Sequence, residues 1–214
     1  MISMSMIPTI LKRWIEMAGI FIGVPLLLTG DLIPRPKSLV MLVTCISCLV
    51  LLLRDKTFDR SRFGWNGYHD WRALSLRFVL IAGCLTLYQV LVEPEIALAT
   101  LRHHPALWLR IMIAYPLLSV VPQEIIYRAF FFHRYHSLFM HEKVSILANA
   151  ALFAFAHILF RNWIAVIGSF FASVLWAITY LRSRSLLVVS IEHALYGTFV
   201  FTLGIGHYFY APDF

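Results

Sequence analysis

Charged residues are scarce in this chain of 214 residues. Asp, Glu, Lys and Arg together make up only 14% of it, whereas 60% of its residues are hydrophobic. A soluble globular domain is typically about 25% charged and about 45–50% apolar. A chain of this length cannot bury so much apolar surface in one aqueous core. The composition therefore excludes an ordinary soluble domain and predicts a protein surrounded by lipid, in agreement with a mean hydropathy of +0.78.

Several familiar catalytic signatures are also missing. The chain has no HExxH sequence, which excludes the usual zinc-binding helix, and its Gly168-Ser169 pair lacks the GxSxG pattern of a serine nucleophile. The GIGH run at 204–207 contains no aspartate, so an aspartyl dyad is not indicated. The basic pair Lys12-Arg13 precedes a long apolar run without a small-residue cleavage site. This pattern indicates a first membrane anchor and not a cleavable signal peptide.

Only three cysteines occur, at positions 45, 48 and 84, and all of them lie inside apolar stretches. Cys45 and Cys48 have the CxxC spacing, which can bind a metal or carry out redox chemistry. Inside a helix, however, two cysteines at this spacing can equally be small buried hydrophobic residues. We expect this second alternative.

Seven apolar stretches are long enough to cross a membrane or nearly so. A bilayer core about 30 Å thick requires roughly 20 helical residues, with a range of about 17–25. We therefore predict an all-α fold, a polytopic transmembrane bundle of about seven helices (range six to eight), which forms a single integral membrane domain over residues 1–214. The stretches are 14–30, 38–54, 75–92, 107–133, 143–160, 162–181 and 185–204.

The basic residues predict an orientation. A net charge of +7 can indicate nucleic-acid binding, but these residues lie between apolar runs and form no stripe, so we expect the lipid bilayer as partner and no nucleic acid. Arg128 excluded, they divide twelve to five between the two sides of a seven-helix bundle. The positive-inside rule then places the N-terminus in the cytoplasm, and we expect a bacterial inner (plasma) membrane. The richer side carries Lys12, Arg13, Arg54, Lys56, Arg60, Arg62, Arg72, Arg77, Arg134, Lys143, Arg182 and Arg184; the other side carries Arg35, Lys37, Arg102, Arg110 and Arg161.

Ionisable residues inside the apolar stretches are the candidates for chemistry, because each costs about 2.5–3.5 kcal/mol on insertion scales. Glu124 and Arg128 are four residues apart and share a helical face; a structural ion pair is one interpretation. His157 stands in an apolar run, where a core histidine bonded across helices is the alternative. Glu192 and His193 lie near the middle of the last apolar run.

Taken together, one carboxylate, one arginine and two histidines on three helices are what hydrolysis inside lipid requires. A carboxylate or a histidine has to take a proton from water. A second group has to donate to the oxyanion that forms on the peptide carbonyl. A water-filled cavity would allow such groups to remain polar at membrane depth.

The order and spacing of these residues resemble the CPBP family, also called the Abi or type II CAAX prenyl endopeptidase family, over about residues 105–200. Its pattern is EExxxR, then FxxxH, then HxxxN. The matching runs here are QEIIYR, FAFAH and HALYG, which contain Gln123, Glu124, Arg128, Phe153, His157 and His193. The resemblance implies a multi-helix membrane endopeptidase that cleaves a membrane-associated protein or peptide substrate.

The family pattern also implies roles for the site residues. Glu124 and His157 would activate water, His193 would assist or stabilise the oxyanion, and Arg128 would hold Glu124. Gln123 would donate a hydrogen bond to the substrate or to the carbonyl oxygen. Members of this family have long been described as metalloproteases, and a Glu/His/His set can bind zinc; a divalent metal held by Glu124, His157 and His193 is therefore an open alternative.

Two departures from the family pattern favour a different class of function. Gln123 replaces the first glutamate of the family pair, commonly assigned as the water activator, and glutamine cannot accept that proton. Gly197 stands where the family often has asparagine. The alternative is therefore a non-catalytic relative, such as a membrane scaffold or an immunity or sorting factor. A proton-coupled transporter is disfavoured because no inverted repeats with broken helices are evident.

Overall fold

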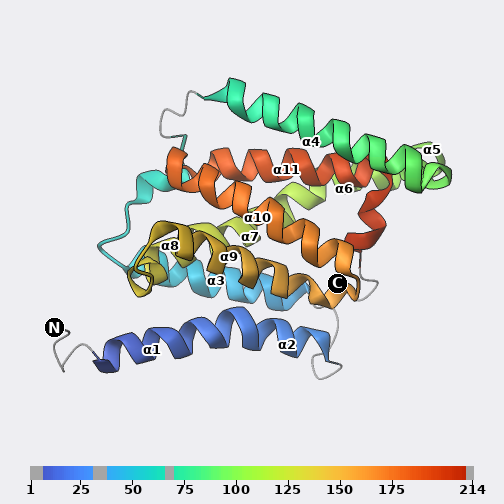
Figure 1. The fold of residues 1–214 in the computed structure, drawn as a ribbon. Coiled ribbons are helices and arrows are strands. Elements are labelled where there is room, and N and C mark those ends of the chain that lie inside the picture. The colour runs from blue at the N-terminus through green and yellow to red at the C-terminus, as the bar shows by residue number, and fades with distance from the viewer. Residues whose placement is uncertain (1–6, 31–37, 66–69, 211–214) are drawn as a thin grey trace.

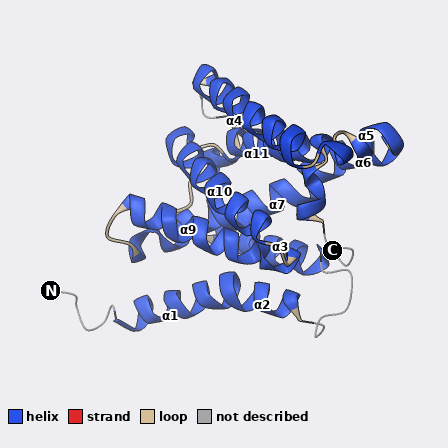
Figure 2. Ribbon diagram, turned by 45° about the vertical axis from the view of Figure 1, so that its right-hand side comes forward, coloured by secondary structure: helices blue, strands red, loops and turns tan. Residues whose placement is uncertain are grey.

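The computed structural model describes residues 7–30, 38–65 and 70–210, and these residues are helical with no strands (Figure 2). The all-α bundle predicted from the composition is therefore confirmed. Each of the seven predicted stretches falls on a helix, and the helix ends differ from the predicted ones by a few residues. The largest difference is at the N-terminal side of the first stretch, where helix α1 begins at Ile7.

Five helical segments of the described chain are long and apolar enough to cross a membrane. They are Trp71–Val92 (α4), Pro105–Leu138, Glu142–Phe160, Trp163–Ser183 (α10) and Leu186–Leu203 (α11). The third of these contains helix α9, Glu142–Ala156. A shorter apolar helix, α3, spans Ser38–Arg54, and α1 (Ile7–Ala18) continues through a π-helical turn into α2 (Val24–Thr29). The chain is thus an integral membrane protein.

The helices lie roughly along one common direction (Figure 1). Helix α4 forms one edge of the bundle, and α1 with α2 forms the opposite edge. Between them lie α11 and α10, then α9 and α3, and the segment that contains α6 (Pro105–Tyr115) and α7 (Val121–Glu124) runs through the middle. The resemblance motifs therefore lie on the central helices.

Local capping explains where the central helices begin and end. The side chain of Asn162 accepts a hydrogen bond from the Ala165 amide at 2.8 Å, and that of Ser185 accepts one from Val188, so these residues cap the N-termini of α10 and α11. Helix α11 ends at Gly204, whose φ of 109° suits glycine. A Cβ on Gly204 would also lie 2.4 Å from the Ile96 carbonyl oxygen.

Apolar side chains cover the outer surface of the bundle, and several polar side chains are buried inside it. Large apolar side chains face outward, as on α4, where Val79 is 63% and Leu91 is 71% exposed. The interior holds a set of buried polar side chains beside its hydrophobic core, and such an arrangement is expected when lipid and not water surrounds the bundle. This buried set comprises Gln89, Glu124, Arg128, Ser145, Asn149, Ser169, Ser173, Thr179, Ser183, Ser185, Ser190, Glu192 and His193.

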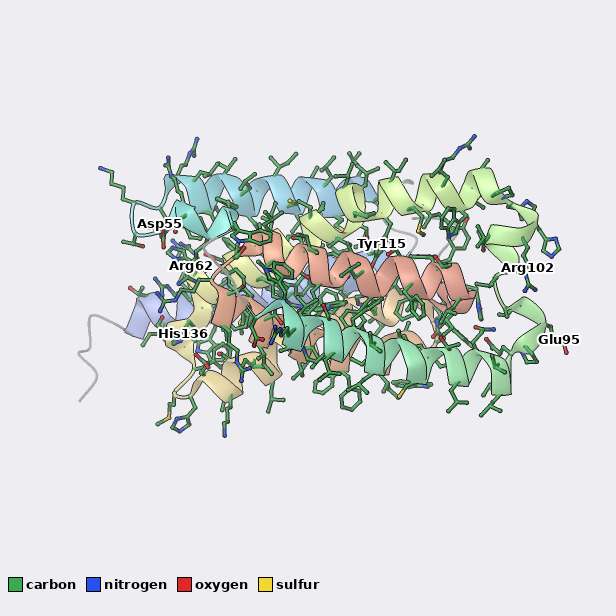
Figure 3. All side chains as sticks on the ribbon, turned by 90° about the horizontal axis from the view of Figure 1, so that it is seen from above. Asp55, Arg62, Glu95, Arg102, Tyr115 and His136 are labelled. Atoms are coloured by element: carbon green, nitrogen blue, oxygen red, sulfur yellow. The ribbon has the colours of Figure 1, made fainter. Side chains whose placement is uncertain are left out.

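Charged residues gather at the two ends of the bundle. Figure 3 shows Asp55, Arg62 and His136 at one end and Glu95 and Arg102 at the other. This is the division predicted for Arg62 and Arg102. Which end faces the cytoplasm stays a prediction, and two of the counted basic residues, at 35 and 37, lie outside the described residues.

Asp55 is held at the end of α3. Its carboxylate accepts hydrogen bonds from the hydroxyl and the amide of Thr57, at 2.7 and 2.9 Å, and lies 3.0 Å from His133 Nε2. The side-chain bond from Thr57, followed by the contact with His133, holds the pKa of Asp55 well below its usual value. This cluster links the loop after α3 to the segment that carries the site.

The membrane segment Pro105–Leu138 departs from regular α-helix twice. Residues Pro116–Val120 and Ile125–Phe130 form wider π-helical turns on either side of α7, before the chain continues in α8 (Phe131–Tyr135). Pro116 has no amide hydrogen to donate to the carbonyl four residues earlier, so the regular bonding is interrupted there. Such turns in helices are frequent at functional sites.

The two cysteines of the CxxC sequence are buried in the hydrophobic core with free thiols. Their neighbours in this core include Phe21 and Leu52. This apolar environment agrees with the expectation that Cys45 and Cys48 are two small buried hydrophobic residues.

Candidate active site

Arg128 is fully buried in the centre of the bundle. Its Nη1 donates to Asn149 Oδ1 on α9, and its Nη2 donates to Ser173 Oγ on α10 at 3.1 Å. Asn149 in turn donates to the Tyr127 carbonyl at 2.7 Å. A guanidinium at this depth requires such partners, because an unpaired charge in apolar surroundings is costly. Arg128 thus joins three segments around one fixed cation.

Glu124 is the carboxylate that compensates Arg128. Its Oε2 lies 3.2 Å from Arg128 Nε, without the alignment of a hydrogen bond, and its side chain is 0% exposed. Its Oε1 accepts from His193 Nδ1 at 2.8 Å. The predicted pair of Glu124 and Arg128 therefore exists, and the carboxylate also contacts the second predicted histidine.

His193 projects from α11 and is clamped on three sides. Its Nδ1 bonds to Glu124, its ring stacks on Trp176 with centroids 3.6 Å apart, and its Nε2 lies 3.1 Å from the Tyr115 hydroxyl. Because an ionised carboxylate only accepts, Nδ1 carries the proton, and Nε2 of the neutral ring is an acceptor. Arg128, Glu124, His193 and Tyr115 therefore form a continuous polar chain.

His157 approaches from another direction, at the end of α9. Its Nδ1 lies 2.8 Å from the Phe153 carbonyl oxygen, which only accepts, so Nδ1 carries a proton. In the neutral ring, Nε2 then has a free lone pair, and no hydrogen bond from the described residues reaches it. The Phe153 ring packs near both imidazoles, with its centroid 4.6 Å from that of His157 and 6.1 Å from that of His193. His157 is thus a half-buried histidine with one nitrogen prepared to accept a proton.

A cavity of about 600 Å³ lies beside these residues. Its lining is mostly apolar, and its polar lining residues include Gln123, His157, His193, Tyr115 and Ser119. Glu124 does not line it, and no other carboxylate among the described residues does. An apolar cavity with a few convergent polar groups is typical of a small-molecule or peptide site.

Gln123 occupies the cavity wall beside the buried glutamate. Its Nε2 donates to Ser119 Oγ at 2.8 Å, one helical turn earlier, and its Oε1 has no hydrogen-bond partner in the described structure. Adjacent positions on one helix thus point in different directions: Gln123 lies at the cavity, and Glu124 lies behind His193.

The predicted residues are therefore brought together in two layers. Gln123, His157 and His193 line the cavity, whereas Glu124 and Arg128 lie behind His193. Glu124, His157 and His193 do not fit a metal in this arrangement: the carboxylate is already occupied, and no group of three His, Cys, Asp or Glu residues in the described part of the chain could hold one.

Glu192, the neighbour of His193, lies outside the site. It is fully buried, and its Oε1 lies 2.9 Å from Arg77 Nη2 on α4. Arg77 also donates to Thr179 on α10 at 3.1 Å. This second ion pair, between the half-buried Arg77 and the buried Glu192, connects α4 with α11 and is structural.

Sequence reasoning missed several residues that complete the site. Asn149, Ser173, Trp176 and Tyr115 all contact the predicted set, yet none belongs to a family motif. Asn149 alone carried a signal, because an amide in an apolar helix needs a partner. Residues such as Tyr115 become recognisable only when the helices are placed in space.

The fold and the site define a general class of protein. It is an all-α membrane bundle in which two histidines line a cavity and a buried glutamate lies behind one of them. The family model for type II CAAX prenyl endopeptidase Rce1-like proteins matches residues 105–199, which contain all three motifs. The comparisons with curated proteins and with solved structures found no match. The predicted CPBP resemblance is confirmed by this match: residues 105–199, the segment that carries the site, are similar to the Rce1-like family, which is a family of CAAX-type intramembrane proteases.

Proposed function

We propose that this protein is an endopeptidase that cleaves a membrane-associated protein near its C-terminal anchor, within the cavity beside His157 and His193. The proposal rests on the hydrogen bonding of the two ring nitrogens of His157. Its Nδ1–H is committed to the Phe153 carbonyl, so Nε2 is free to accept a proton at the cavity wall. The matching family is named for type II CAAX prenyl endopeptidases, so a prenylated CAAX peptide is the substrate to test first.

The chemistry follows from this arrangement. A water oxygen attacks the carbonyl carbon of the peptide bond, one water proton passes to His157 Nε2, and the carbonyl oxygen becomes an oxyanion. The C–N bond then breaks as His157 returns that proton to the leaving nitrogen. The second water proton leaves with the new carboxyl group.

Glu124 receives a different role from the one that the motif implied. Both of its oxygens face protein partners, Arg128 and His193, and it does not line the cavity. We therefore assign Glu124 to positioning: it fixes the His193 tautomer and orientation, as a carboxylate does behind a catalytic histidine. Glu124→Gln should then reduce kcat less than His157→Ala does. If both variants fold and both lose cleavage activity completely, Glu124 and not only His157 acts as the base.

The experiment uses purified protein in lipid nanodiscs and an internally quenched farnesylated peptide that ends in a CAAX box. Cleavage is followed by fluorescence, and the products are identified by mass. We expect His157→Ala to reduce kcat about 10²–10⁴-fold, the usual contribution of a general base.

His207→Ala is the matched control for this experiment. His207 makes the same type of contact, Nδ1 to the Gly204 carbonyl at 2.9 Å, but it is exposed and outside the cavity lining. Its variant should cleave like the wild type. If the wild type is no more active than His157→Ala, the proposed function is wrong.

One observation favours a non-catalytic scaffold as the second candidate, namely that Gln123 leaves the cavity without a carboxylate among its described lining residues. Gln123→Glu separates the two candidates. In a working variant enzyme the added carboxylate should have little effect or reduce cleavage, since it competes for the same proton. If the protein is a scaffold, the wild type is inactive, and Gln123→Glu either creates cleavage activity or leaves the protein inactive.

A further inference from the structure

Gly197 and Tyr115 share one space in the bundle. A Cβ placed on Gly197 would lie 2.3 Å from both Oη and Cε1 of Tyr115. Cβ atoms essentially never approach other heavy atoms so closely, so the tyrosine ring fills the volume that any side chain at 197 would occupy. The absence of a side chain on α11 is therefore matched by a large one on α6.

The same tyrosine brings a hydroxyl to the cavity. Tyr115 lines it, and its Oη lies 3.1 Å from His193 Nε2. Since Nε2 of the neutral ring is an acceptor, the hydroxyl donates to it. Figure 3 shows Tyr115 between the two charged ends of the bundle.

Ring packing fixes where this hydroxyl points. The Tyr115 ring packs edge to face against Phe201, with centroids 5.1 Å apart, and against the His193 ring at 6.1 Å. Tyr115 is also the last residue of α6, directly before the π-helical turn Pro116–Val120. The ring is therefore held between neighbours, while its hydroxyl hydrogen can still rotate about the C–O bond.

We propose, resting on the proposed function, that the Tyr115 hydroxyl donates to the substrate oxyanion and so replaces the polar side chain that is missing at Gly197. In the free protein the hydrogen points to His193 Nε2. When the carbonyl oxygen becomes negative, the hydrogen turns toward it, because a hydrogen bond to an ion is roughly twice as strong as a neutral one. The covalent O–H bond of Tyr115 stays intact in this step, and the hydrogen bond to His193 Nε2 is exchanged for one to the oxyanion.

Tyr115→Phe is the direct test, because it removes the hydroxyl and keeps the ring that fills the space at Gly197. Loss of one oxyanion donor typically costs about 10²–10³-fold in kcat. We expect this loss with the farnesylated CAAX peptide, and a KM within about twofold of the wild type, since the bond forms only after the carbonyl oxygen becomes negative. Tyr135→Phe is the control: Tyr135 is buried and donates to Glu16 at 2.9 Å, outside the cavity lining.

A reciprocal exchange tests the shared space. Gly197→Asn alone should disrupt the site, because its Cβ meets the Tyr115 ring. Tyr115→Ala should lose activity as Tyr115→Phe does. The double variant Tyr115→Ala/Gly197→Asn provides both room and an amide donor, and it should recover at least about tenfold over Tyr115→Ala. The double variant Tyr115→Ala/Gly197→Leu refills the same space with a side chain of similar size that has no donor, so a merely structural role for Tyr115 predicts equal recovery in the two double variants.

Binding provides a readout that does not depend on turnover. A peptide phosphonate imitates the charged tetrahedral intermediate, and its affinity should fall at least about tenfold in Tyr115→Phe, whereas the parent peptide binds both proteins equally. If the wild type cleaves and Tyr115→Phe cleaves and binds like it, Tyr115 is not the donor and the proposed function stands. If the wild type neither cleaves the peptide nor prefers the phosphonate, both the proposed function and the role of Tyr115 are wrong.

Discussion

Replacing Arg128 by methionine tests whether the buried ion pair organises the site. The substitution keeps an unbranched side chain of similar length but removes the cation that compensates Glu124 at 3.2 Å. It also removes the donors to Asn149 and Ser173, all inside a region without exposed surface. Removing one partner of a buried pair typically costs about 3–5 kcal/mol, because the other charge is left uncompensated. We expect a loss of that size in the free energy of unfolding.

A double-mutant cycle makes the prediction sharper. Glu124→Gln alone leaves Arg128 uncompensated and should cost a similar amount, whereas the double variant Glu124→Gln/Arg128→Met leaves no buried charge at this point. The two losses should therefore not add, and a coupling energy of about 2–3 kcal/mol is expected for residues in one network. Unfolding by sodium dodecyl sulfate in bicelles measures all four proteins. Single losses below about 1 kcal/mol, or simple additivity, would show that the pair is not important.

Three further outcomes are expected. Reporter fusions at Arg62 and at Arg102 should indicate opposite sides of the membrane, with Arg62 cytoplasmic; signals from one side would contradict the arrangement of the two ends. Glu192→Gln should destabilise the fold by uncoupling α4 through Arg77, and still permit cleavage by the remaining folded protein, which a kcat per folded molecule checks. Because the pKa of Asp55 is lowered in the folded protein, the ionised carboxylate contributes stability that is fully present above the unfolded pKa of about 3.9 and is lost as the pH falls further. Asp55→Asn should therefore be less stable than the wild type at pH 7, and the melting temperatures of the two proteins should converge in acid.

The sequence predicted the helices well because lipid imposes a simple rule. A span needs a fixed length of apolar residues, and all seven predicted stretches fall on helices. It also predicted the Glu124–Arg128 pair, since spacing along one helix decides which residues share a face. Local periodicity is sufficient for both kinds of statement.

Contacts between helices could not be predicted in the same way. The sequence placed Glu124 in the cavity with His157, but the position of Glu124 behind His193 depends on two π-helical turns and on how α11 packs against α7. The filling of the space at Gly197 by Tyr115 depends on the approach of α6 to α11. Residues far apart along the chain leave no short pattern to recognise.

The π-helical turn Ile125–Phe130 begins directly after Glu124 and contains Arg128. A π turn holds one residue more than an α turn, so in evolutionary terms it behaves as an accommodated insertion. Deleting one residue from it would restore the regular period and rotate everything upstream by about 100° relative to α8. Gln123 would then no longer face the cavity, although every site residue would still be present. The site therefore depends on the number of residues in this turn as much as on the identity of the side chains. A chain with the same motifs but one residue fewer here is not expected to share the site.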